Sequence, residues 1–179
     1  MATATDRLVT FAEFEKIPNA PDGRHELRHG ELVKVPPPEF PHFRIQHRLR
    51  KLLESAAPAA GEVEIEFAFR ALPEHEYRIA DVAFVARNRW ALAGRYFEGA
   101  PDIVIEILSP SNSAAEMLDK EQLCLENGAK EFWVVDPARR HVRVSTADGR
   151  FAEYKSGRQI PLFFGGSVGV DEIFADETK

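Results

Sequence analysis

Two apolar stretches of the chain each carry one acidic residue, and they restrict the possible fold more than any other feature. Residues 78–85 have the pattern of a strand and contain Asp81, whereas residues 103–108 have the pattern of a second strand and contain Glu106. The second stretch is apolar enough for the middle of a sheet. An ionised carboxylate in such a position is unfavourable unless a cation or a hydrogen-bond donor compensates its charge. The pair therefore indicates a shared metal ion, although either carboxylate alone is explained more simply by strand alternation toward solvent.

The sequence around these strands predicts a mixed sheet with helices packed on it. Ile45, Leu49 and Leu53 recur at helical spacing, and basic residues fall on another face of the same segment. A second helix is expected to end at Asn127-Gly128, a pair suited to a left-handed cap. In chain order, the central elements are expected to be a helix over 41–55, a strand over 63–70, the two acidic strands, a helix over 114–126 and a strand over 132–136.

The two ends of the chain carry turn signals. Thr10 is positioned to cap a short helix, which is followed by a turn through residues 18–23, and His29-Gly30 predicts the turn of a hairpin. Asp148-Gly149 predicts a second hairpin, and residues 165–174 are expected to add an edge strand and a terminal turn. The expected fold class is α/β (α+β): one domain over residues 1–179, with a central mixed β-sheet flanked by helices, an N-terminal hairpin and C-terminal antiparallel strands.

Composition excludes several classes of protein. The 179 residues are 44% hydrophobic and 29% charged, which is typical of a globular protein. There is no apolar run of the roughly 20 residues that a membrane span needs, and the first residues lack the pattern of a secretory signal. A cytoplasmic protein is expected. Cys124 is the single cysteine, and it is interpreted as a small buried residue on a helix.

The charge pattern excludes a protein that coats DNA through a basic surface. Net charge is −6, and binding to nucleic acid relies largely on Lys and Arg near phosphates. Positive charge is concentrated locally, for example in Arg44, Arg48 and Lys51 on the helix over 41–55. Each such cluster can equally be a solvated face.

The residue types favour metal-dependent phosphodiester hydrolysis. Mg²⁺ prefers oxygen ligands and keeps several waters, so Asp81 and Glu106 with few other donors suffice, and Mn²⁺ is an alternative ion. Lys120, on the predicted helix over 114–126, could orient the attacking water or offset negative charge in the transition state. The alternative for Lys120 is a solvated lysine paired with Asp119 or Glu116. Glu26 could contact the ion through a shared water, or it could make a structural hydrogen bond.

The order of these elements resembles the PD-(D/E)XK nuclease superfamily, and the chain resembles the Uma family of restriction-endonuclease-like proteins over almost its whole length. The matching pieces, specific as an ordered series, are residues 25–33, His42, residues 79–83, residues 101–111, Asp119-Lys120 and residues 127–137. The resemblance implies a restriction-endonuclease-like fold, a Mg²⁺-dependent cut in DNA, and a backbone carbonyl of Ile107 beside the metal. It also places the usual superfamily lysine at Leu108, so Lys120 would be a lysine that has migrated to the following helix. Ala80 and Cys124 also depart from many relatives, but neither change removes a metal ligand.

Other readings of the sequence remain open. His25 and His29, or His42 and His47, could form a zinc site, although Gly30 favours a hairpin over the helix that the His25–His29 spacing would need. Asp136-Pro137 is better explained as a turn. Two functions are therefore kept: a Mg²⁺-dependent DNA endonuclease that acts as a homodimer, since two symmetric sites can cut both strands, and a nuclease-fold module that binds nucleic acid or assembles without catalysis.

Overall fold

A computed structural model of the protein describes residues 7–17, 24–56, 58–110 and 112–175. The turn expected through residues 18–23 lies outside the described residues. Among the helices that are described, none has the length and apolar character needed to cross a membrane.

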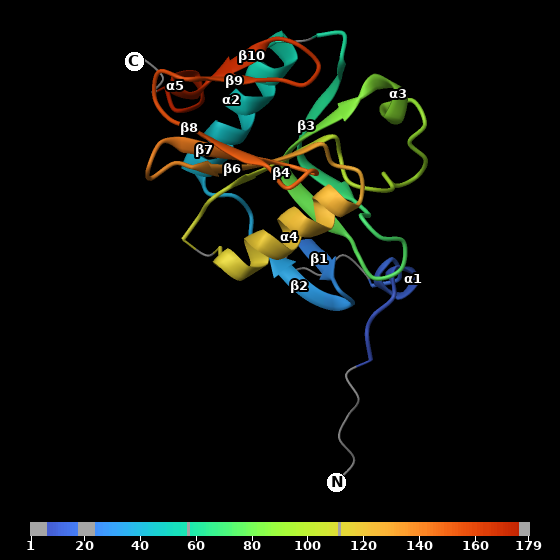
Figure 1. Ribbon diagram of the computed structural model, residues 1–179. Helices are drawn as coiled ribbons and strands as arrows, with labels where there is room; N and C mark the ends of the chain where they lie inside the picture. The colour runs from blue at the N-terminus through green and yellow to red at the C-terminus, as the bar shows by residue number, and fades with distance from the viewer. Residues whose placement is uncertain (1–6, 18–23, 57, 111, 176–179) are drawn as a thin grey trace.

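A six-stranded mixed sheet forms the centre of the molecule, as the sequence predicts (Figure 1). Its strands lie side by side in chain order, and only β5 and β6 run parallel to each other. The parallel pair needs a crossover, which α4 supplies between the two strands. The strands of this sheet are β3 (Gly61–Phe69), β4 (Arg78–Ala86), β5 (Ile103–Ile107), β6 (Glu131–Asp136), β7 (His141–Thr146) and β8 (Phe151–Tyr154).

Two long helices, α2 (Phe40–Ala56) and α4 (Ala114–Glu126), pack into separate apolar cores. Leu49 and Leu53 of α2 join a core with inward-facing residues of the sheet such as Trp133. Met117, Leu123 and Cys124 of α4 join the second core with Val104 and Phe132 of the neighbouring strands. Because Val104 and Ile105 are successive residues of β5 and lie in different cores, both faces of this strand are buried. The prediction of a central, fully covered strand is thereby confirmed.

Local sequence signals fix where α4 begins and ends. The Ser113 hydroxyl accepts from the backbone N–H of Glu116, and the Glu116 carboxylate accepts from Ser113 in return, which is a capping box. At the other end Gly128 adopts φ +114, a conformation that favours glycine. Thr10 makes the same kind of box for the short helix α1 (Phe11–Phe14), and a second short helix, α3 (Arg87–Trp90), follows β4.

The predicted N-terminal hairpin is present as β1 (Arg24–Arg28) and β2 (Glu31–Val35). Its turn uses His29 and Gly30, both with positive φ. The hairpin is joined to the segment before β4 by an isolated antiparallel bridge between Leu27 and Tyr77. In Figure 1 it lies close to α4, so that β1 contributes to the same region as β4 and α4.

The C-terminal part agrees with the sequence prediction in one hairpin and differs in the other. The Asp148-Gly149 turn joins β7 and β8 as expected. The strand expected within residues 165–174 is β10 (Ser167–Gly169), but it is not an edge strand of the central sheet. It pairs with β9 (Gln159–Pro161), a strand that the sequence analysis did not predict, and it leads into the short helix α5 (Val170–Ile173). Apolar residues of this hairpin and helix extend the core beside α2, which explains their separate position.

Candidate active site

Lys120 is buried against the sheet instead of pointing into solvent. Only 8% of the residue is exposed, and its Nζ atom donates to the backbone oxygen of Ile79 at 2.7 Å. The same Nζ lies 2.8 Å from Oε1 of Glu106 and 3.7 Å from Oε1 of Glu26. The alternative of a solvated lysine is therefore wrong.

The two acids named as partners in that alternative are engaged elsewhere. Asp119 pairs with Arg78 at 3.0 Å and with His29 at 2.7 Å. Glu116 pairs with Arg28 at 2.9 Å, in addition to its role in the capping box. Because both acids pair with other residues, neither is the partner of Lys120.

Glu106 is a buried carboxylate whose charge is only partly compensated. Burial raises its pKa to about 8, Lys120 acts in the opposite direction, and the charge of Asp81 raises the pKa further. The pKa of Lys120 is itself raised, because Glu106 and Glu26 outweigh the effect of its burial. The Lys120 ammonium therefore keeps its positive charge. A further positive charge nearby would stabilise the ionised form of Glu106.

Asp81 is tied directly to the strand that carries Glu106. Its Oδ2 accepts a hydrogen bond from the backbone N–H of Ile107 at 2.7 Å. Its Oδ1 lies 3.0 Å from Nε2 of His42 and accepts from Nε2 of Gln46 at 3.3 Å. The Asp81 side chain is 20% exposed. The two carboxylates thus lie on neighbouring antiparallel strands and are close enough for their charges to interact.

Glu26 lies behind Lys120 and uses both carboxylate oxygens in hydrogen bonds. Oε1 accepts from the backbone N–H of Ile79 at 2.7 Å, and Oε2 accepts from Nε of Arg28 at 2.6 Å. Burial alone would raise its pKa, but Lys120, Arg28 and the Ile79 N–H together lower it below the ordinary value. Glu26 is therefore an anion that anchors β1 to β4 and faces Lys120.

Two residues of this region were not assigned a role from the sequence, Gln46 of α2 and Glu66 of β3. A third, His42 of α2, was considered only as a zinc ligand. Burial alone would lower the pKa of His42, but the hydrogen bond and charge of Asp81, with smaller effects of Glu66 and Glu106, raise it. Gln46 is fully buried and donates to both Asp81 and Glu66. A polar residue in line with the apolar positions of α2 was the available signal for Gln46, and the four-residue spacing from His42 places both on one face.

The donor atoms suit a hard divalent cation. Two carboxylates, one of them buried with a raised pKa, are oxygen ligands of the kind that Mg²⁺ prefers. Over the described residues there is no group of three or more His, Cys, Asp or Glu side chains arranged to hold a metal ion, which gives no support to a histidine-based zinc site. Asp81 and Glu106 would thus need water, phosphate or backbone oxygens to complete a shell. The Asp81 contact with Ile107 brings the backbone of Ile107 beside these carboxylates.

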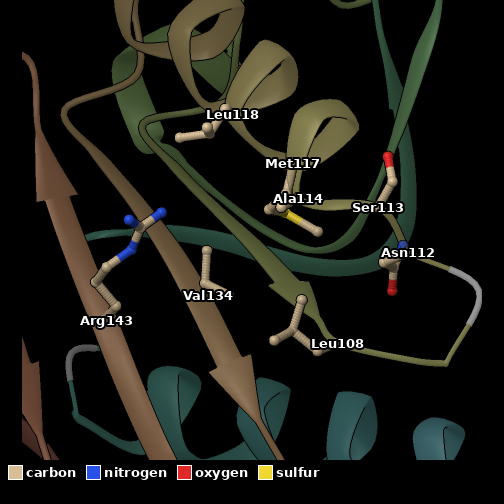
Figure 2. A pocket seen from close by; sticks show the side chains of 8 residues that line it. All are labelled: Leu108, Asn112, Ser113, Ala114, Met117, Leu118, Val134 and Arg143. Atoms are coloured by element: carbon tan, nitrogen blue, oxygen red, sulfur yellow. The ribbon is translucent and has the colours of Figure 1, made fainter.

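Leu108, at the position of the usual superfamily lysine, faces a different environment. It lines a pocket of about 370 Å³ at the N-terminal end of α4. Figure 2 shows Leu108, Met117 and Val134 bordering the same space, with Arg143 at its side. Arg143 is paired with Glu121. The pocket wall next to the site is thus mainly apolar.

Two of the arginines of α2 are used within the molecule. Arg48 donates to the backbone oxygen of Ile173 at 3.1 Å, and Arg50 pairs with Glu54 at 2.8 Å and with Glu64 at 3.3 Å. Asp136 is likewise structural, since its Oδ1 accepts from the backbone N–H of Arg139 in the turn that the sequence predicts.

The fold places the protein in the nuclease-fold class. A crystal structure described as "a putative nuclease belonging to DUF820" from Anabaena variabilis superposes with a TM-score of 0.80 at 21% sequence identity, covering 93% of this chain and 98% of that one. No curated protein matches the chain. The model of the Uma2 family, described as "Putative restriction endonuclease", matches residues 11–165. The chain belongs to the Uma2 family, and the resemblance inferred from the sequence is confirmed.

Proposed function

We propose that the protein is a Mg²⁺-dependent DNA endonuclease that hydrolyses phosphodiester bonds at Asp81 and Glu106. The observation that carries the proposal is the arrangement of these two carboxylates: Asp81 binds the backbone N–H next to Glu106, and Glu106 is buried with a raised pKa beside a lysine. Titratable groups perturbed by burial and by specific charged neighbours are typical of catalytic sites. Membership in the family and the nuclease fold support the same function.

The chain would supply ligands, orientation and one positive charge. Asp81, Glu106 and the carbonyl oxygen of Ile107 would hold the metal ion, which when bound polarises a phosphate and lowers the pKa of a water. Lys120 would stabilise the negative charge that develops on the phosphate, or orient the attacking water, from its position 2.8 Å from Glu106. Because its Nζ is held by Ile79 as well, little reorganisation would be needed during the reaction.

Glu26 is proposed as a positioning residue and not as a metal ligand. Both of its oxygens already accept hydrogen bonds, and its anionic charge faces the Lys120 ammonium at 3.7 Å. It would keep the ammonium directed at Glu106. The shared-water contact with the ion considered from the sequence is the weaker interpretation of this geometry.

A non-catalytic module remains the second candidate, because Leu108 and the apolar pocket replace the usual lysine environment. The net charge of −6 and the internal bonding of Arg48 and Arg50 argue against strong binding to DNA, which also favours this second candidate. In such a module, the carboxylates would still bind an ion but no substrate would be cut.

The proposal is tested by comparing wild type with Asp81→Asn and Glu106→Gln on plasmid and oligonucleotide substrates. Cleavage should need Mg²⁺ or Mn²⁺, should stop with chelator, and should be lost in both variants, because each removes an anionic ligand. Glu98→Gln is the matched control, since Glu98 is an exposed carboxylate paired with Arg70. Metal binding without cleavage of any substrate by wild type would favour the module, and cleavage unaffected by either variant would refute the site.

We also propose that two copies act together as a homodimer on duplex DNA, because two symmetric sites can cut both strands. Light scattering at several protein concentrations, with and without DNA, measures the oligomeric state. A protein that stays monomeric throughout and nicks only one strand would contradict this part of the proposal.

A further inference from the structure

The pocket at the N-terminal end of α4 lies directly beyond the pair formed by Glu106 and Lys120. Val134 of β6 is paired with Glu106 in the parallel register, and Met117 stands three residues before Lys120 on the same side of α4. Leu108 follows Glu106 by two residues, so it projects from the same face of the sheet. Val134, Met117 and Leu108 all line the pocket. Its apolar floor therefore begins where the proposed catalytic groups end.

The pocket has a buried floor and an open mouth. Met117 and Val134 are only 7% and 8% exposed, whereas Ala114 and Leu118 are exposed to solvent. Figure 2 shows these four side chains around one space. Its volume of about 370 Å³ falls within the range of pockets that bind small ligands, about 300–1,000 Å³. The space is thus suited to a flat ring system that packs its faces on aliphatic side chains.

Polar groups stand at the side and at the rim of this floor. Arg143 of β7 is paired with Val134 in the register and forms an ion pair with Glu121 of α4, which holds its guanidinium beside the pocket. A planar guanidinium can stack on a ring or donate to its edge. At the rim, Oδ1 of Asn112 accepts from the N–H of Ser109 at 2.7 Å and from its hydroxyl at 2.9 Å, so the amide nitrogen is the end that can donate to a ligand. Apolar walls with a few polar groups at the edge are typical of pockets that hold a nucleobase outside a base stack.

The charge of the protein favours a contact of this kind. Net charge is −6, and Arg48 and Arg50 of α2 are bonded within the molecule. Phosphate contacts, which supply most of the affinity of basic nucleic-acid-binding proteins, are therefore restricted. A base held in an apolar pocket would add affinity that does not depend on charge.

We propose that this pocket receives one unpaired nucleobase of the substrate, from a nucleotide next to the cleaved phosphate. The inference rests on the proposed function, because that function makes a nucleic acid the ligand. A base is joined to its phosphate through one sugar, which agrees with a pocket that begins beside Glu106 and Lys120. A base in a duplex must first leave the stack, and the free-energy cost is smallest where it is mismatched or already single-stranded. The protein should therefore prefer single strands and mismatched sites to intact duplex.

The test measures binding by fluorescence anisotropy with chelator present, so that no cleavage interferes. The probes are a single-stranded oligonucleotide, its matched duplex and a duplex with one mismatch, and wild type should bind the matched duplex most weakly. Ala114→Trp and Val134→Phe fill the pocket from the mouth and from the floor. Each should weaken binding of the single strand about tenfold and abolish the preference over matched duplex. Ala115→Trp is the matched control, because Ala115 is the next residue of α4, is exposed and lies outside the pocket, so its replacement should change neither quantity.

A 2-aminopurine base at the mismatch reports where the base goes. Its fluorescence is low in a base stack and rises when the base leaves the stack, and an aliphatic floor does not quench it. Wild type should raise the fluorescence on binding, and the two filling variants should not. Arg143→Lys should weaken binding while the dependence of affinity on salt stays as in wild type, because the variant keeps the charge but loses the planar face.

The outcomes separate this inference from the proposed function. Mg²⁺-dependent cleavage by wild type, with binding that neither filling variant changes, overturns the base pocket and leaves the proposed function intact. Selective binding that both filling variants abolish, without cleavage of any substrate, supports the pocket and refutes the endonuclease. Filling variants that lose a dimer but keep wild-type binding of all three probes would assign the pocket to a second copy of the chain and overturn the inference. Wild type that neither binds nor cleaves any probe refutes both.

Discussion

Replacing Lys120 by methionine tests the charge balance of the site through stability, without any substrate. Methionine keeps most of the buried stem, so the cavity term should be small. The lost groups are the ion pair with Glu106 at 2.8 Å and the hydrogen bond to Ile79 at 2.7 Å. Removing one partner of a buried ion pair costs about 3–5 kcal/mol, because the other charge stays buried and unpaired. This loss overlaps with that of the hydrogen bond, so we expect Lys120→Met to lose about 3–5 kcal/mol in total.

Urea denaturation at about pH 9, above the raised pKa of Glu106 and with chelator present, measures this loss. The double variant Lys120→Met with Glu106→Gln removes the unpaired charge, and it should therefore recover about 1 kcal/mol or more relative to the single variant. Lys51→Met is the control: Lys51 is an exposed lysine of α2, and its replacement should change stability by no more than about 0.5 kcal/mol. A loss below about 1 kcal/mol for Lys120→Met, or an equal loss in the double variant, would refute the role of Lys120 as the compensating charge.

The same variant has a catalytic consequence under the proposed function. Lys120→Met should keep Mn²⁺ binding but lower the cleavage rate by about 10²-fold or more, which is the scale for loss of one preorganised electrostatic group. Lys120→Arg should also be impaired, since a planar, larger guanidinium does not fit the site of a compact ammonium. A fully active Lys120→Met enzyme would show that this lysine takes no part in the reaction.

Two further predictions concern the fold. Burial raises the pKa of Glu131, outweighing the hydrogen bond from Nε1 of Trp133, so the folded state loses stability relative to the unfolded state as pH rises above the ordinary glutamate pKa. Glu131→Gln should therefore raise the melting temperature at about pH 7 but not at about pH 4, and a gain that is equal at both values would contradict this origin. Gly30 and Gly149 both have φ near +80, but only at Gly30 would a Cβ meet a neighbour, Leu8 Cβ at 2.6 Å. By urea denaturation Gly149→Ala should cost about 1 kcal/mol and Gly30→Ala at least about 1 kcal/mol more, whereas equal losses would show that Leu8 moves aside freely.

The elements that the sequence predicted correctly are those set by local patterns. The cap at Thr10, the left-handed Gly128, and the turns at His29-Gly30 and Asp148-Gly149 depend on residues that are adjacent or three positions apart. The apolar strands are equally local, because burial on both faces of β5 follows from an almost continuous apolar run.

The unpredicted parts depend on contacts between segments far apart in the chain. β9 is three residues long, and it is recognised as a strand only through its pairing with β10. Glu66 gives no separate signal, since a glutamate on an alternating strand is ordinarily solvated, and the only signal of Gln46 is its place in line with the apolar positions of α2. Only the pairing of β3 with β4, which places Glu66 level with Asp81, brings Glu66 to Gln46.

The position of Lys120 shows that the positive charge beside Glu106 can come from an element other than the strand that carries Glu106. A lysine at position 108 would follow directly after the strand that carries Glu106, so local backbone geometry would hold the ammonium near the carboxylate. Lys120 instead reaches Glu106 from α4, and it also binds Ile79 of β4 and faces Glu26 of β1. Lys120 therefore compensates the charge of Glu106 only while α4 is docked on the sheet. Substitutions that destabilise this docking should leave Glu106 less well compensated, although they change neither Asp81 nor Glu106.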